Sequence, residues 1–171
     1  MKKSNIAKKY FIQVLVLVVL FYIIYGTRAF YNWVMEPVMK AYANIGTWIL
    51  SLFGQGVQAE GTQILSKGLT LNISIGCDGV EAMALFAIAL VSMPVAFALR
   101  LRGLGIGLLI LILVNIFRIV SLYFIGTYWN STFEFFHVYF WQVAYIIIAA
   151  MIWYWWADKY LLNPLKTVEN E

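Results

Sequence analysis

The sequence predicts an α-helical integral membrane protein with about four transmembrane helices, an amphipathic helix and a small external β-hairpin. Apolar residues make up 63% of the chain and charged residues only 12%, whereas soluble domains are roughly half apolar and about a quarter charged. Several apolar runs approach the roughly 20 residues that cross a bilayer. One short segment instead alternates apolar and polar residues, which is typical of a strand.

The first segment predicts a membrane anchor helix over residues 1–27. An apolar run extends from Tyr10 to Tyr25, and four lysines precede it: Lys2, Lys3, Lys8 and Lys9. A signal peptide has a similar pattern but ends in a small-x-small cleavage site, which the residues from Tyr25 to Arg28 do not provide. We therefore expect a retained helix with its N-terminus in the cytoplasm.

Residues 28–79 are expected to lie outside the membrane, as an amphipathic helix and a hairpin. Over Val38 to Phe53, polar residues recur at helical spacing: Lys40, Asn44, Thr47 and Ser51. At about 16 residues this segment is short for a span, so we expect it to lie at the outer surface or pack on the bundle. Leu69 to Ile75 alternates with a period of two and, with Thr62 to Leu65, predicts the hairpin. An open sheet edge cannot face lipid.

Residues 80–157 predict a three-helix core within a single membrane domain over residues 1–171. The expected spans are Val80 to Leu99, Leu104 to Gly126 and His137 to Trp156, with a loop from Thr127 to Phe136. The second of these spans starts in a glycine run that contains GxxxG, a pattern that permits close helix contact. Residues 158–171 form a polar tail that we expect in the cytoplasm.

The positive residues predict the orientation. With four spans, Arg100 and Arg102 fall on the same side as the N-terminal lysines, as the positive-inside rule requires. A fifth span over Val38 to Phe53 would move both arginines outside. We therefore expect a multi-pass protein of the cell membrane with both termini in the cytoplasm.

Three chemically distinctive residues converge near the outer leaflet in this topology. Cys77, the only cysteine, opens the second span, and His137, the only histidine, opens the fourth. Arg118 lies within the third span, roughly 12 Å below its outer end. A cysteine thiolate attacks carbonyls, a histidine moves the proton, and an arginine stabilises an oxyanion. The three residues are therefore candidates for acyl transfer.

Four neighbouring residues are candidates for supporting roles. Asp78 and Glu81 have the spacing of a capping box at the start of the second span, and Gly79 lies between them. The positive end of that helix favours thiolate over thiol. Asn115 is three residues before Arg118 and therefore shares its helix face.

Other functions stay open on the sequence alone. Cys77 as an inert buried residue, Arg118 as a counter-ion for Glu81, Glu134 or Asp78, and His137 as a polar tip in the headgroups would suit a non-enzymatic scaffold or assembly subunit. A small transporter would use Arg118 in an anion path, but transporters typically show inverted repeats or broken helices, and we find neither pattern. The scattered basic residues do not indicate a nucleic-acid partner, and we expect no cofactor and no metal.

At these residues the sequence resembles the exosortase/archaeosortase family of membrane transpeptidase-like enzymes. The resemblance covers about Gly61 to Trp156 and rests on Cys77-Asp78-Gly79, on Asn115-Ile116-Phe117-Arg118 and on His137. Asp78 replaces the small residue that the family commonly has. The resemblance implies that Cys77, Arg118 and His137 are catalytic. It also implies protein substrates with a C-terminal motif, a transmembrane helix and a basic tail, which are cleaved through a thioester and passed to a surface or lipid acceptor.

Overall fold

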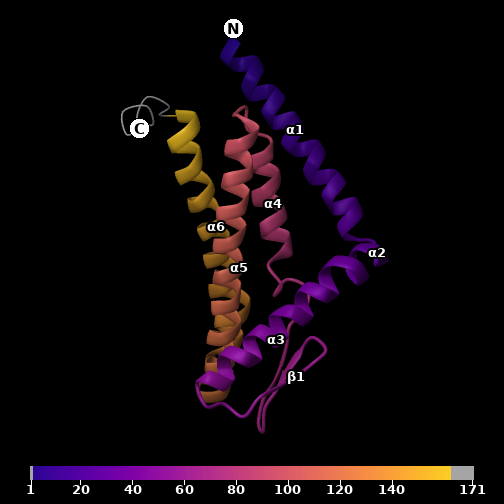
Figure 1. Ribbon diagram of the computed structural model, residues 1–171, viewed down its shortest axis with the longest axis vertical. Coiled ribbons are helices and arrows are strands. Elements are labelled where there is room, and N and C mark those ends of the chain that lie inside the picture. The colour runs from indigo at the N-terminus through magenta and orange to yellow at the C-terminus, as the bar shows by residue number, and fades with distance from the viewer. Residues whose placement is uncertain (1, 163–171) are drawn as a thin grey trace.

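The chain folds into a bundle of long helices with a smaller helix-and-sheet layer at one end (Figure 1). This computed structural model describes the backbone of residues 2–162 and the side chains of residues 8–160. Helix α1 (Lys2–Tyr25) leads through a tight turn into α2 (Arg28–Phe30), a π-helical segment η1 (Tyr31–Met35) and α3 (Glu36–Leu52). The Thr27 hydroxyl starts this second run because it accepts a hydrogen bond from the Phe30 N–H, which the helix itself leaves unpaired.

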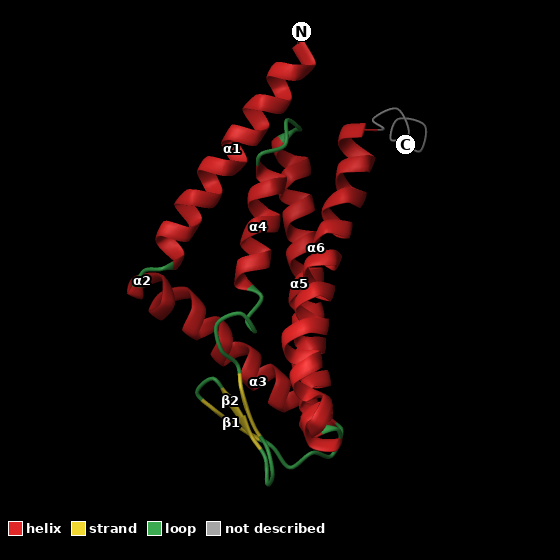
Figure 2. Cartoon of the chain, turned by 180° about the vertical axis from the view of Figure 1, so that it is seen from behind, coloured by secondary structure: helices red, strands yellow, loops and turns green. Residues whose placement is uncertain are grey.

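The expected hairpin is a three-stranded antiparallel sheet. Strands β1 (Gln58–Glu60), β2 (Gln63–Leu65) and β3 (Thr70–Asn72) lie in the order β1-β2-β3. Figure 2 shows the sheet beside α3. Ile64 of β2 pairs with Leu71 of β3, and both are buried in one cluster with residues of α3. The alternating pattern therefore predicts β3 correctly, whereas the prediction missed β1.

Helix α4 (Val80–Val91) is shorter than the predicted span from Val80 to Leu99. Pro94 is the physical reason, because a proline disfavours helical backbone in the residue before it. The chain turns over residues 92–96, and α5 (Phe97–Tyr128) starts earlier than predicted. At 12 residues α4 is about 18 Å long, whereas the 32 residues of α5 extend about 48 Å, well beyond a hydrocarbon core of roughly 30 Å.

The segment after α5 is more helical than predicted. A 3₁₀ turn η2 (Asn130–Thr132) and a π-helical segment η3 (Phe135–Phe140) lead into α6 (Trp141–Ala157) and η4 (Asp158–Leu162). The expected loop from Thr127 to Phe136 is therefore mainly helix. The rest of the predicted tail, residues 163–171, lies outside the described residues.

The predicted class, an α-helical membrane protein with a small sheet, is confirmed. The number of helices long enough to span a membrane differs from the four predicted. Within the described residues, three helical stretches are long and apolar enough to cross a membrane: Lys8–Tyr25, Phe97–Tyr128 and Phe135–Tyr160. Helix α4 is apolar but too short to cross alone. The start of α1, the α4–α5 turn and the end of α6 lie at one end of the molecule, and the sheet lies at the other (Figures 1 and 2).

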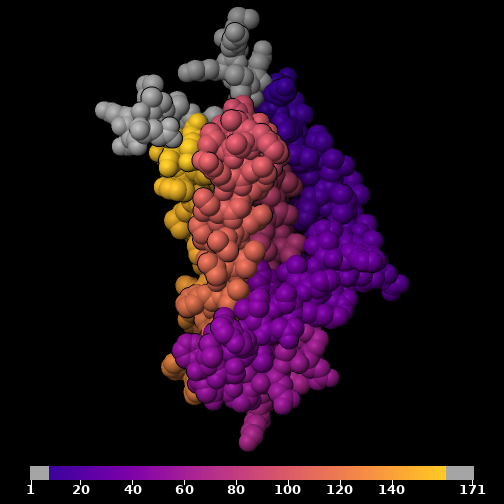
Figure 3. Space-filling view, in the orientation of Figure 1, coloured from indigo at the N-terminus to yellow at the C-terminus, as the bar shows by residue number. Residues whose placement is uncertain are grey.

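Helix α3 packs on the bundle. Its buried face does not coincide with the large apolar side chains opposite the polar stripe. Its buried residues are Met39, Tyr42, Ala43, Gly46 and Leu50. The apolar side chains of Trp48 and Leu52 are instead 63% and 67% exposed. Small residues permit close contact, as at Gly46, where an added Cβ would lie 3.0 Å from Ile64. In Figure 3, α1 and α3 form one side of the molecule, next to α5.

The buried residues form two separate hydrophobic clusters. One cluster joins α3 and the sheet to the last third of α5, through Ile119 and Tyr123. The other cluster joins α4, the first half of α5 and α6, and includes Phe86, Leu111 and Trp156. Since Leu111 belongs to one cluster and Ile119 to the other, the boundary crosses α5 between these two residues.

The glycine run of α5 makes the close helix contacts that its pattern predicts. An added Cβ at Gly103 would lie 2.5 Å from the Trp156 ring of α6, and one at Gly107 would lie 2.2 Å from Phe86 of α4. Both separations are below van der Waals contact, so no larger residue fits without a shift. Gly105, which faces away, has no neighbour within 4 Å of an added Cβ.

Candidate active site

Cys77 lies in a tight turn between β3 and α4, at the boundary between the two clusters. Gly76 and Gly79 flank it with φ angles of +87° and +69°, a backbone conformation that favours glycine. The Cys77 N–H donates to the Ser74 carbonyl at 2.9 Å. An added Cβ at Gly79 would lie 2.7 Å from the Tyr145 hydroxyl oxygen. The turn is therefore fixed by backbone geometry and by close contact with α6.

The imidazole of His137 contacts the thiol directly. Its Nε2 lies 2.8 Å from Cys77 Sγ, at hydrogen-bond distance. His137 belongs to η3, and π-helical turns are frequent at functional sites because they re-aim side chains. The ring stacks on Phe133, with centroids 5.4 Å apart. Helix geometry and stacking together hold the base against the sulfur.

The guanidinium of Arg118 completes a group of three. Its side chain is buried, Nη1 donates to the Gly76 carbonyl at 3.3 Å, and Nη2 lies 3.8 Å from Cys77 Sγ. Its Nε has no hydrogen-bond partner. In the part of the chain whose side chains are described, Arg118 forms no salt bridge with a carboxylate. The counter-ion interpretation, which paired Arg118 with Glu81, Glu134 or Asp78, is therefore wrong for the described residues.

Asn115, which lies one helical turn before Arg118 on α5, also contacts the loop that carries Cys77. Its Nδ2 donates to the Cys77 carbonyl at 3.2 Å, and its side chain is fully buried. The shared helix face of Asn115 and Arg118 is thus the face against which the cysteine turn lies.

The predicted capping box does not form. The N-cap of α4 is Gly79, without a side-chain cap. Asp78 is fully buried, and its Oδ1 accepts from the Val80 N–H at 3.2 Å. Glu81 instead accepts a hydrogen bond from the Tyr22 hydroxyl of α1. The physical reason is the left-handed Gly79, which separates Asp78 from the first helical turn, together with a phenol that pairs with Glu81.

The surroundings of Cys77 favour the neutral thiol over the thiolate. Burial raises its pKa above the ordinary value, and the nearby Arg118 charge acts in the opposite direction. Burial likewise raises the pKa of the Asp78 carboxyl. The helix start was expected to lower the thiol pKa, but Cys77 precedes the first residue of α4 by three positions and is desolvated, which favours its neutral form. A base beside the sulfur can offset this effect by taking the proton, and His137 Nε2 is at hydrogen-bond distance.

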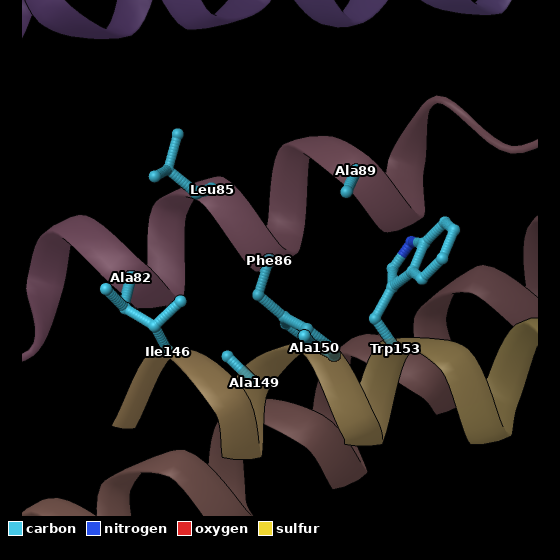
Figure 4. A pocket seen from close by; sticks show the side chains of 8 residues that line it. All are labelled: Ala82, Leu85, Phe86, Ala89, Ile146, Ala149, Ala150 and Trp153. Atoms are coloured by element: carbon cyan, nitrogen blue, oxygen red, sulfur yellow. The ribbon is translucent and has the colours of Figure 1, made fainter. Parts of the chain in front are cut away.

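A pocket of about 130 Å³ lies next to the cysteine turn, lined by Gly76, Gly79, Arg118 and Tyr145 among others. It shares Ala82, Leu85 and Ile146 with a larger pocket of about 350 Å³ between α4 and α6, whose side chains Figure 4 shows. Sequence analysis missed the pocket residues Tyr145 and Gln142. A signal existed for Gln142, because it is the only side-chain amide within the predicted span from His137 to Trp156.

Among the described residues, no three His, Cys, Asp or Glu side chains lie close enough together to hold a metal ion. The groups that meet at the cysteine turn are a thiol, an imidazole and a guanidinium.

The site thus brings together a thiol, an imidazole and a guanidinium whose Nε has no hydrogen-bond partner, and these are the groups that acyl transfer can use. The comparison with protein families agrees with this chemistry: the model of the transmembrane exosortase family matches residues 5–156, and the chain belongs to that family. Neither the curated proteins nor the solved structures give a match. Membership supports a transpeptidase-type role in general.

Proposed function

We propose that this protein is a cysteine protease-transpeptidase that cleaves the C-terminal sorting signal of exported proteins at the outer face of the membrane. The observation that carries the proposal is the approach of His137 Nε2 to Cys77 Sγ at 2.8 Å, with Arg118 Nη2 at 3.8 Å from the same sulfur. A nucleophile paired with a base is the signature of covalent catalysis. Family membership supports the same reaction type.

The residues divide the reaction as follows. His137 takes the thiol proton as Cys77 Sγ forms a bond to the carbonyl carbon of the substrate, and the carbonyl oxygen becomes an oxyanion. The unpaired Nε and the remaining Nη protons of Arg118 are the donors for that oxyanion. His137 then protonates the leaving amine as the C–N bond breaks, leaving a thioester. An amine or water gives its proton to His137, attacks the thioester and releases the thiol.

The substrate that we propose carries a short motif followed by a transmembrane helix and a basic tail. The larger pocket supports this choice, since it runs from the catalytic pocket along α4 and α6 and is lined by Ala82, Ala89, Ala149 and Ala150 (Figure 4). Small residues permit a further helix to pack closely. A substrate helix in this groove would place its outer end beside Cys77.

The sheet supports an extended binding mode for the motif. Strand β3 is an edge strand, and the chain runs from it into the cysteine turn. An extended peptide can pair with such an edge. We expect crosslinkers at Thr70, Asn72 or Ser74 to capture the substrate motif. Capture only at the opposite ends of the helices would contradict this binding mode.

The experiment is the processing of a tagged exported protein from the same genome that ends in a motif, a transmembrane helix and a basic tail. We expect Cys77→Ala to abolish cleavage at normal abundance, because the covalent route needs the sulfur, and His137→Ala to leave at most a trace. Full cleavage by Cys77→Ala would overturn the cysteine mechanism.

A pair of variants tests the proposed docking of the substrate helix in the larger pocket between α4 and α6. We expect Ala150→Leu, which fills the groove, to lower processing while alkylation of Cys77 stays unchanged. Ala98→Leu, an exposed alanine of α5 outside the groove, is the control. Equal processing by both variants would contradict docking of the substrate helix between α4 and α6.

A further inference from the structure

A separate pocket lies at the opposite end of α4 from the cysteine, and the proposed reaction does not use it. Its volume is about 330 Å³, and it is lined by Lys9, Tyr10, Gln13, Ser92, Met93, Pro94 and Arg100. This volume is within the range of small-molecule sites, roughly 300 to 1,000 Å³. The residues come from the start of α1, the α4–α5 turn and the start of α5, which lie at one end of the molecule (Figure 1).

The lining is cationic. Lys9 and Arg100 are its charged residues, and no Asp or Glu is among them. Gln13, Ser92 and the Tyr10 hydroxyl add neutral polar groups. A pocket with two positive charges and no carboxylate favours an anion.

Hydrogen bonds hold the Arg100 guanidinium in place, and a hydrogen bond of the neighbouring Tyr10 positions the backbone at Lys9. Arg100 donates from Nε to the Val95 carbonyl at 2.9 Å and from Nη1 to the Val91 carbonyl at 3.1 Å. These bonds use two of the five guanidinium donors, so the others remain for a ligand. Next to Lys9, the Tyr10 hydroxyl donates to the Ala89 carbonyl at 3.2 Å. That bond fixes the start of α1 on the end of α4, and Lys9 is carried with it.

The surroundings indicate the rest of the ligand. Phe97, at the start of α5, and Phe11, next to Tyr10, are 71% and 65% exposed. Both rings are therefore available to acyl chains beside a polar pocket. This end of the molecule also holds Lys8 and Arg102, and the positive-inside rule assigns such an end to the cytoplasmic leaflet.

We propose that this pocket binds the phosphate of an anionic phospholipid headgroup, held between Lys9 and Arg100. Basic pockets between transmembrane helices on the cytoplasmic side are suited to such headgroups. The bound phosphate bridges α1 and the α4–α5 turn. It thereby adds a link between α1 and the rest of the bundle, to which Tyr10 and Tyr22 contribute hydrogen bonds.

The test is a titration of the purified full chain in neutral detergent with phosphatidylglycerol, read by native mass spectrometry. We expect Lys9→Gln to weaken binding about fivefold, since one basic residue near a lipid surface contributes about 1 kcal/mol. Lys8→Gln removes the same charge one residue away and does not line the pocket, so its affinity should match that of the unchanged chain. Lys9 is exposed and outside the proposed active site, so cleavage in a fixed lipid mixture serves as a check that the variant is folded.

Two results would overturn the anion site itself, and a third would overturn its assignment to a lipid. Equal weakening by Lys9→Gln and Lys8→Gln would show diffuse attraction to surface charge, and equal binding of phosphatidylcholine would show that headgroup charge is irrelevant. A parallel titration with inorganic phosphate distinguishes the source of the ligand. Binding of inorganic phosphate that depends on Lys9, without binding of phosphatidylglycerol, would retain the anion site and overturn its assignment to a lipid.

Discussion

The sulfur of Cys77 lies within 2.8 Å of the His137 imidazole and 3.8 Å of the Arg118 guanidinium. Burial raises the pKa of the thiol while Arg118 lowers it, so the sign of an Arg118 substitution can be worked out. Removing the positive charge takes away a stabiliser of the thiolate, and the pKa must rise further.

We therefore expect Arg118→Gln to shift the pH profile of Cys77 alkylation to higher pH. At neutral pH, where the thiolate is the reactive form, alkylation should become slower. The measurement is the rate of iodoacetamide labelling against pH in purified protein. Arg102→Gln, which removes an equal charge far from the thiol, should leave the profile in place, and a shift to lower pH in Arg118→Gln would contradict the arrangement.

The geometry of Arg118 matters as well as its charge. Arg118→Lys keeps the charge but loses the planar fork that donates to Gly76 and reaches the sulfur. Loss of one oxyanion donor typically costs about 10²- to 10³-fold in rate, and we expect a loss of this order in substrate processing. Abundance in the membrane is the control, because a loss of activity in parallel with a loss of protein would indicate a structural role instead.

At the scale of elements, the glycines of α5 offer a matched pair of substitutions. Gly107→Ala places a methyl group 2.2 Å from Phe86, whereas Gly105→Ala meets open space. Overpacking typically costs 1–3 kcal/mol, so Gly107→Ala should lower thermal stability by about that amount. Gly105→Ala should be neutral or stabilising, since alanine is the better helix former. Equal melting temperatures would contradict the close α4–α5 contact.

Patterns that depend on local chemistry predicted the elements well. The alternation from Leu69 to Ile75 predicted β3, and the sequence placed Asn115 and Arg118 on one helix face that the structure shows against the cysteine turn. The end of α4 was missed because hydropathy does not change at Pro94, although the backbone does.

Other features of the site depend on contacts between segments that are far apart in the chain. Such contacts cannot be predicted from the local pattern of a single sequence. The pairing of Glu81 with Tyr22 replaces the predicted capping box across 59 residues of chain. The buried face of α3 was also missed, since small residues such as Ala43 and Gly46 are selected for close packing rather than for hydrophobicity.

At the scale of the whole molecule, the arrangement of the helix ends predicts the topology. In a Cys77→Ser background, we expect Lys67→Cys, near the sheet, to react with a membrane-impermeant maleimide in intact cells. Ala96→Cys, in the α4–α5 turn, should react only after permeabilisation. Both positions are exposed, so access to reagent decides the result, and the reverse pattern would place the cysteine turn at the cytoplasmic side.

The short length of α4 has a consequence for the surrounding bilayer. Its roughly 18 Å falls about 12 Å short of a typical hydrocarbon core. We therefore expect the lipids next to α4 to shorten or tilt, at a cost of fractions of a kcal/mol per Å of mismatch. Such local thinning would give water access to the turn that carries Cys77.

Bilayer thickness should accordingly control the reaction rate. In vesicles of matched headgroup composition, we expect cleavage to slow as the acyl chains lengthen, because restoring the thin region then costs more. Alkylation of Cys77 by a water-soluble reagent should decline in parallel. Rates that are independent of acyl length would mean that solvent reaches the sulfur by way of the sheet, whatever the thickness of the surrounding lipid.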